Sequence, residues 1–181
     1  MKFDKKKFLK LLREQEQVKK KGELLTNFTE AKQDELIKYK TWIGDQIYWE
    51  SRESYLQILK QFVNKEIDGE QFRKQFCHLR SSNMTASEML TKKFEDEALD
   101  VSLQSTETNI QINPKSYKFG RKISTIFYLL DLYDPDLTFE QDLSSLEIFP
   151  DALMYAMSEE SLRLMIKDID LPEVKKYCND F

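Results

Sequence analysis

The stretch Tyr55–Arg80 constrains the fold most, because it has the pattern of two amphipathic helices joined by a tight acidic turn. Apolar residues recur there at steps of three and four, which places them on one face of each helix. These residues are Tyr55, Leu56, Leu59, Phe62 and Val63 before the turn, and Phe72, Phe76 and Leu79 after it. In the turn, Asp68 precedes Gln71 by three residues, a capping-box pattern that marks a helix start. The stretch predicts a packed helical hairpin.

Similar periodicity predicts further helices on both sides of this hairpin. One runs from about residue 3 to 20, and another region from 29 to 64 is either one long bent helix or two. Thr85 and Glu88 form a second capping-box pattern, which predicts a new helix beginning there. We expect a polar loop over residues 102–120, in which Ile110 and Ile112 alternate with polar neighbours as in a short strand.

The C-terminal part reads as helical as well. Residues 122–133 are apolar nearly all round, as in a central core helix, and the Asp134-Pro135-Asp136 sequence ends it. Ser158 is placed to cap a helix, and Pro150 and Pro172 are placed to begin short ones. The sequence therefore predicts an all-α fold. We expect a single-domain antiparallel helical bundle over residues 29–181, with a basic N-terminal helical extension over residues 1–28.

Composition agrees with a folded chain that is neither secreted nor spans a membrane. Of its 181 residues, 40% are hydrophobic and 12% aromatic. No apolar run approaches the length of a membrane span, and the start alternates Lys with Phe and Leu, unlike a signal peptide. Lys outnumbers Arg 22 to 6 while Gly, Ala and Pro are few, as an AT-rich genome produces. We expect a cytoplasmic location, or the stroma of an organelle if the gene is organellar.

The residues that carry most enzyme chemistry are scarce. His78 is the only histidine, and it follows Cys77 directly, so on a helix the two side chains point about 100° apart. The other cysteine, Cys178, is distant, the 4 glycines are scattered, and no acidic cluster has the pattern of a calcium-binding loop. We therefore expect no enzyme activity, no cofactor and no metal site.

Charge is distributed unevenly along the chain. Residues 1–40 carry 12 Lys or Arg against 7 Asp or Glu, whereas residues 131–181 carry 4 against 13, a net charge of −9. The acidic part favours a basic partner. The basic start, next to Phe3, Phe8 and Leu9, has two interpretations: a contact for nucleic acid or an anionic membrane, or an amphipathic helix docked on its own domain. We favour the docked helix, and we expect neither a direct nucleic-acid contact nor a membrane contact.

Three segments carry a resemblance to a known family. They are FVNKEIDGEQFRKQF, with Phe62, Asn64, Ile67, Phe72 and Phe76 at the matching positions, then ISTIFYLLDLYDPD and SEESLRLMIKDI. Over about residues 52 to 170 the chain resembles the colicin D immunity protein family and related bacterial self-immunity proteins. The resemblance implies a small α-helical inhibitor that binds a toxic nuclease domain and masks its basic active-site cleft. The N-terminal extension and the 102–120 loop depart from the family's pattern.

Two hypotheses for function follow from these observations. In the first, the chain is an immunity-type inhibitor of a basic toxin or nuclease domain. In the second, it is a non-catalytic structural or assembly subunit of a larger complex, held by its N-terminal helix and exposed aromatic residues. For the first hypothesis the predicted partner-binding residues are Asp131, Asp134, Asp136, Glu140 and Asp142.

Overall fold

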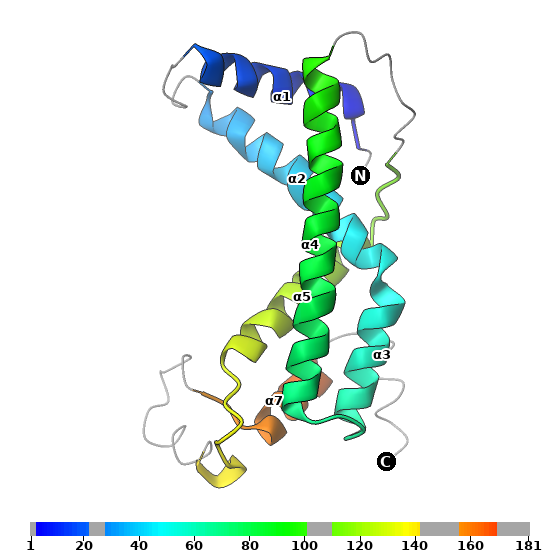
Figure 1. Cartoon of the computed structure of the whole chain (residues 1–181), viewed down its shortest axis with the longest axis vertical. Coiled ribbons are helices and arrows are strands. Elements are labelled where there is room, and N and C mark those ends of the chain that lie inside the picture. The colour runs from blue at the N-terminus through cyan, green and yellow to red at the C-terminus, as the bar shows by residue number, and fades with distance from the viewer. Residues whose placement is uncertain (1–2, 22–27, 101–109, 142–155, 170–181) are drawn as a thin grey trace. The chain divides into compact units, whose positions relative to one another are not determined.

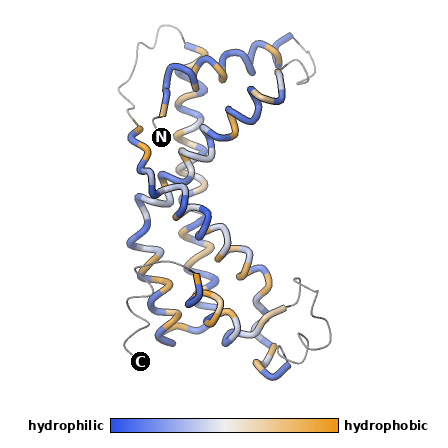
Figure 2. The backbone as a smooth tube through the Cα atoms, turned by 180° about the vertical axis from the view of Figure 1, so that it is seen from behind, coloured by the Kyte–Doolittle hydropathy of each residue, from blue (hydrophilic) through white to orange (hydrophobic). Residues whose placement is uncertain are grey.

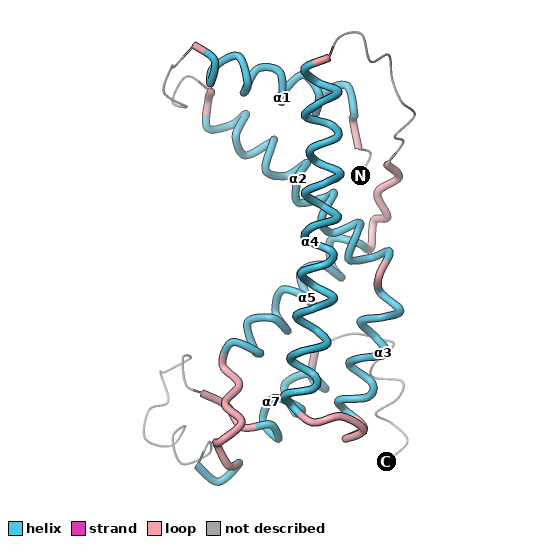
Figure 3. Tube along the Cα trace, in the orientation of Figure 1, coloured by secondary structure: helices cyan, strands magenta, loops and turns pink. Residues whose placement is uncertain are grey.

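The computed structural model describes residues 3–21, 28–100, 110–141 and 156–169 (Figure 1). Its helices are α1 (Lys5–Lys20), α2 (Glu30–Glu50), α3 (Arg52–Val63), α4 (Gly69–Leu99), α5 (Ser116–Asp131) and α7 (Glu159–Asp168). Within these ranges there is no strand, as Figure 3 shows, and one isolated bridge pairs Tyr133 with Met157. The expected fold class, an all-α helical bundle, is confirmed.

The chain divides into two compact units, and each is assembled from separate parts of the sequence. The first unit contains residues 1–49 and 82–120, and the second contains residues 50–81 and 121–181. Along each helix, hydrophobic and hydrophilic segments alternate (Figure 2), as expected of helices that bury one face.

The first unit is built around α1, α2 and the later part of α4. Lys7 pairs with Glu35 and Lys32 pairs with Glu14, so α1 and α2 are antiparallel neighbours (Figure 1). The helices meet over an aromatic cluster in which the Phe8 ring stacks on Tyr39 at 5.2 Å between centroids. The buried core residues are Phe8, Leu9, Leu11, Leu12, Phe28, Leu36, Tyr39, Ile43, Phe94 and Ala98.

The second unit contains the helical hairpin that the sequence predicts. The Phe62 ring of α3 stacks on the Phe72 ring of α4, with centroids 4.2 Å apart. Both residues are fully buried. At the turn, Asp68 Oδ1 accepts a hydrogen bond from Gln71 N at 2.7 Å, and Gln71 Oε1 accepts one from Asp68 N at 3.2 Å. The predicted capping box is therefore formed in both directions, and α7 packs against α3 to cover the hairpin.

The predicted helix start at Thr85 is wrong. α4 continues through this position without interruption from Gly69 to Leu99. No Gly or Pro occurs between residues 70 and 99, so nothing in the backbone ends the helix before Thr85. The region from 29 to 64 is two helices, because α2 ends at Glu50 and α3 begins at Arg52.

The predicted start of the next helix, at residue 122, is also wrong. α5 already begins at Ser116, after a turn in which Ser116 N donates to Asn113 O at 3.0 Å. Asn113 Oδ1 also accepts from Lys115 N at 2.9 Å, so the side chain closes this turn. Residues 110–113 are not a strand, although Ile110 packs on the core. The helices predicted at Pro150 and Pro172 lie outside the described residues.

The N-terminal helix is docked on the first unit. Phe8, Leu11 and Leu12 are buried, as the docked-helix interpretation predicts. The interfacial interpretation requires Phe8 and Leu9 to face a membrane, but both lie in the core. The boundary between residues 28 and 29 stays a prediction. Among the described helices, none combines the length and the apolar character needed to cross a bilayer.

Candidate functional site

An acidic group of side chains surrounds Tyr133 in the second unit. The bridge between Tyr133 and Met157 brings the chain after α5 beside the chain before α7: Asp134 N donates to Met157 O at 3.0 Å. The Tyr133 ring lies against Gly69, where a Cβ atom would come within 2.4 Å of it. Only glycine leaves room for the ring at the start of α4.

A hydrogen bond at Gly69 also joins the start of α4 to the start of α7. Ser158 caps α7, its Oγ accepting a hydrogen bond from Ser161 N at 3.3 Å. Glu159, in the first turn of α7, accepts a hydrogen bond from Gly69 N at 2.7 Å. Each exposed amide at a helix start is a favourable place for a carboxylate.

The pKa of Tyr133 is shifted by burial and by the acidic side chains around it. Burial, followed by the carboxylates of Glu159, Glu70 and Asp68, raises the pKa of Tyr133 to about 12. Each of these effects disfavours the phenolate. The hydroxyl is therefore neutral at physiological pH. We call Tyr133 together with Asp68, Glu70 and Glu159 the Tyr133 cluster.

Arg163 is a buried, positively charged residue beside the Tyr133 cluster. Its Nη2 donates to Ile67 O at 3.0 Å and pairs with Glu159, and its guanidinium lies 4.0 Å from the centre of the Phe62 ring. The side chain is only 8% exposed. Arg163 therefore ties α7 to the turn between α3 and α4, and it balances one carboxylate of the cluster.

The predicted partner-binding residues surround the same segment. Asp131 is exposed at the end of α5, Asp136 is exposed in the turn that follows, and Glu140 is exposed in the helical residues 139–141. Asp134 is half-buried, and its Oδ1 accepts from Asp136 N at 3.0 Å. Asp142 lies outside the described residues. Within the described part of the chain, Asp131, Asp136 and Glu140 form no ion pair.

Sequence reasoning missed the members of the Tyr133 cluster that come from other segments. Asp68 and Glu70 flank Gly69, and Glu159 follows the cap residue Ser158, so each lies at the start of a helix. The signal for their meeting was weak: one glycine between two acids, at the first position of a helix. The helical turn at 139–141 also had a signal, since Thr138 and Gln141 cap each other, with Thr138 N donating to Gln141 Oε1 at 2.8 Å.

Cys77 and His78 do not form a nucleophilic pair in the structure. Cys77 is half-buried on α4 and His78 is exposed. Burial raises the pKa of the Cys77 thiol, which lowers the fraction of reactive thiolate at neutral pH. Among the residues that the structure describes, no three His, Cys, Asp or Glu side chains gather as metal ligands would.

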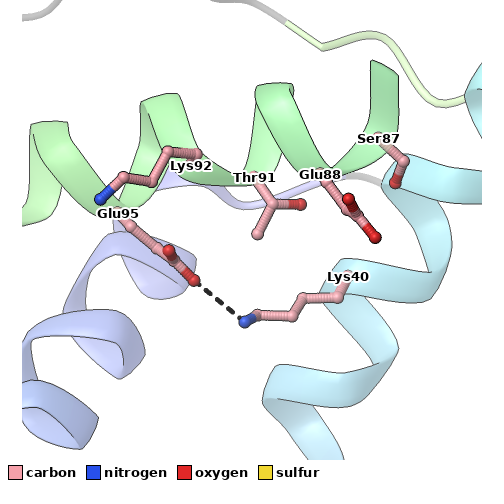
Figure 4. Close-up of a pocket in the computed structure, with 6 residues that line it drawn as sticks. All are labelled: Lys40, Ser87, Glu88, Thr91, Lys92 and Glu95. Atoms are coloured by element: carbon pink, nitrogen blue, oxygen red, sulfur yellow. Dashed lines mark hydrogen bonds and ion pairs between the residues drawn. The ribbon is translucent and has the colours of Figure 1, made fainter. Parts of the chain in front are cut away.

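A polar groove in the first unit lies between α2 and α4. Lys40 and Glu95 point toward each other across it, with their charged atoms 3.1 Å apart (Figure 4). Ser87, Glu88, Thr91 and Lys92 complete its walls, and Lys92 pairs with Asp96 at 2.9 Å. The positive charges of this groove are thus already neutralised, and the groove presents no unpaired cation to an anion.

In comparisons with known proteins, no family model matches this chain, and neither does any curated protein or any solved structure.

Proposed function

We propose that the protein is an immunity-type inhibitor, which binds a basic toxic nuclease domain through the acidic surface around the end of α5. The observation that carries the proposal is the unpaired charge of three exposed carboxylates at this surface, in the acidic part of the sequence. Residues 131–181 have a net charge of −9, and the exposed carboxylates Asp131, Asp136 and Glu140 have no ion-pair partner among the described residues.

The Tyr133 cluster supports this proposal by adding carboxylates from α4 and α7 to the same region. A surface with one sign of charge speeds the encounter with an oppositely charged partner. A nuclease cleft that binds phosphates is basic, so it would be complementary to this surface. A carboxylate that is exposed and unpaired breaks no internal ion pair when it enters such a complex, and the partner's cations replace the hydration that it loses.

The test uses the double charge reversal Asp131→Lys and Asp136→Lys. Any basic nuclease domain encoded by a neighbouring gene serves as the candidate partner, and the measurements are the association rate at two salt concentrations and the inhibition of DNA or RNA cleavage. We expect association to slow by about tenfold or more at low salt and by much less at high salt, because salt screens the field.

A matched control reverses two exposed acids of the first unit, Asp34→Lys and Glu88→Lys, which changes the net charge equally. We expect this control to slow association far less than the reversal at α5. Equal slowing in both variants would show that only net charge matters. An unchanged rate in the α5 variant, or no inhibition by the parent protein, would contradict the proposal.

The alternative function, a non-catalytic assembly subunit, has one observation in its favour. Several large apolar side chains are exposed on the second unit: Tyr128 on α5 is 69% exposed, and Leu164 and Met165 on α7 are 47% and 46% exposed. Such residues are common in protein interfaces. Co-purification of the protein in a large complex, unchanged by the Asp131 and Asp136 reversals, would favour this second function.

A further inference from the structure

A cavity of about 400 Å³ lies in the first unit, between α2 and the segment that leads into α5. Its walls are mostly apolar. They are formed by Lys38, Trp42, Ile112, Asn113, Pro114, Ser116 and Tyr117. The volume falls within the range of small-molecule sites, which have mostly apolar walls and a few polar groups. Two aromatic rings, those of Trp42 and Tyr117, are suited to stacking on a planar ring.

The walls of this cavity are held in place by the fold. The Trp42 ring meets the buried Tyr39 ring edge to face at 5.2 Å, which fixes it from the core side. On the other wall, Asn113 N donates to Gln46 Oε1 at 2.8 Å, so the turn is tied to α2. The Asn113 side chain also closes the turn before α5. A cavity with fixed walls binds a ligand with little cost of ordering.

Lys38 makes this cavity favourable for a negatively charged ligand. It is exposed on α2, one turn before Trp42. Some lysines of the first unit have carboxylate partners, as Lys7 has with Glu35 and Lys40 with Glu95. Lys38 has no ion pair with any residue that the structure describes. Its ammonium group is therefore available to an anion at the rim of the cavity.

We propose that this cavity binds a small aromatic anion, whose ring lies between Trp42 and Tyr117 and whose carboxylate or sulfonate pairs with Lys38. The cavity's size limits the ligand to one or a few rings. Lys38, the cation among the described residues that line the cavity, favours an anion over a neutral molecule of the same shape. This site lies in the first unit and is independent of the acidic surface of the second.

The test uses two fluorescent probes of nearly the same shape, anilinonaphthalene sulfonate, which is an anion, and N-phenylnaphthylamine, which is neutral. Each is titrated into the full-length protein. We expect one site for the sulfonate, with Lys38→Met weakening its binding by about tenfold, equivalent to about 1.4 kcal/mol. The neutral probe should bind the Lys38→Met variant as well as the parent. Tyr117→Ala should weaken the binding of both probes.

Two control variants match these changes outside the cavity. Lys40→Met removes a positive charge from the same helix, and Tyr128→Ala removes an exposed tyrosine from the same helix as Tyr117. We expect both controls to bind the sulfonate as the parent does. All four variants change side chains that are not buried in a core, so circular dichroism should report the parent's helix content for each.

Three outcomes would overturn the proposal. The first is sulfonate binding unaffected by Lys38→Met and Tyr117→Ala, and the second is an equal loss in the control variants, which would indicate general adhesion to apolar surface. The third is displacement of the probe by a proline-rich peptide and not by aromatic carboxylates such as naphthoate. That result would assign the groove to a peptide, because proline helices also bind between aromatic rings.

Discussion

Gly120 and Gly44 both lie inside helices, but the space beside them differs. A Cβ atom at Gly120 would come within 1.9 Å of Asp45 Oδ1, whereas one at Gly44 would find Ser87 Oγ at 3.5 Å, an ordinary contact. Alanine in place of glycine favours a helix by about 1 kcal/mol. We expect Gly44→Ala to raise the free energy of unfolding by about 0.5 to 1 kcal/mol. We expect Gly120→Ala to lower it by about 1 to 3 kcal/mol, as overpacking does.

Urea unfolding of the two variants measures this difference. Each variant is the other's control, because both make the same chemical change in the same unit. If Gly120→Ala were as stable as Gly44→Ala, the close approach of Asp45 to α5 would be wrong.

Tyr133 predicts a dependence of stability on alkaline pH. Its pKa is about 12 in the folded protein and 10.0 in the unfolded chain, so the folded state favours the neutral phenol. The stabilisation is fully present below pH 10 and is lost as the pH rises toward 12. We expect Tyr133→Phe to lose less stability than the parent between these two pH values, as measured by urea unfolding. An identical slope in both proteins would contradict the burial of this hydroxyl.

Single residues show clearly where prediction from the sequence stops. The Asp68 and Gln71 capping box was predictable, because its two members are three residues apart and their interaction is local. The hydrogen bond from Gly69 to Glu159 joins residues 90 positions apart, and no local pattern encodes it. The Tyr133 cluster depends on that bond. The sequence therefore showed its acidic residues but not that they lie together.

At the scale of elements, Arg163 is the link between α7 and the hairpin. Its guanidinium is almost fully covered, and it pairs with Glu159 and bonds Ile67 O. We expect Arg163→Met to lower the free energy of unfolding by about 1 to 3 kcal/mol, because it leaves Ile67 O without this hydrogen bond and removes the cation beside Glu159, whose side chain is 36% exposed. Thermal or urea unfolding measures the loss.

A double-mutant cycle measures the interaction between Arg163 and Glu159. Its second change is Glu159→Gln, which keeps the shape of the side chain but removes its charge. We expect the double variant, Arg163→Met with Glu159→Gln, to regain part of the stability that Arg163→Met loses. Strict additivity of the two single changes would show that the ion pair contributes nothing. The exposed pair Lys92 and Asp96 on α4 is a suitable comparison, and changing it should lower stability much less than the Arg163 change does, because water and salt screen an exposed pair.

Whole helices were easier to predict than their ends. The hairpin, α1 and α2 follow from apolar periodicity, which reflects burial of one face. The same capping pattern occurs at Asp68 and at Thr85, but only Asp68 caps a helix. Asp68 follows a turn in which Lys65 has a φ of 60°, whereas Thr85 lies in the unbroken helix α4. A cap pattern therefore marks a helix start only where the preceding chain has left the helix.

At the scale of the whole molecule, neither compact unit is a continuous stretch of the sequence. Each unit takes residues from two separated stretches, and α4 and α5 both contribute to the two units. Periodicity within a helix cannot reveal this, because it identifies a buried face and not the partner of that face. The charge difference between the ends was predictable from composition alone, whereas the residues that gather around Tyr133 were not.

The role of the N-terminal helix can be tested by removing residues 1–28. α1 covers the aromatic cluster of the first unit, where the buried Phe8 contacts Tyr39 and Phe94. We expect hydrogen exchange, followed by mass spectrometry, to show that α2 and residues 82–99 lose protection in the shortened chain, because their apolar faces become exposed to water. The helices of the second unit, α3 among them, should keep theirs, since they have a separate core. In the full-length chain, Phe8→Ala should lower the hydrogen-exchange protection of the same two segments. It should also lower the free energy of unfolding by about 3 to 5 kcal/mol. If the shortened chain instead keeps the protection of α2, then residues 29–181 are an independent domain and the boundary expected from the sequence is correct.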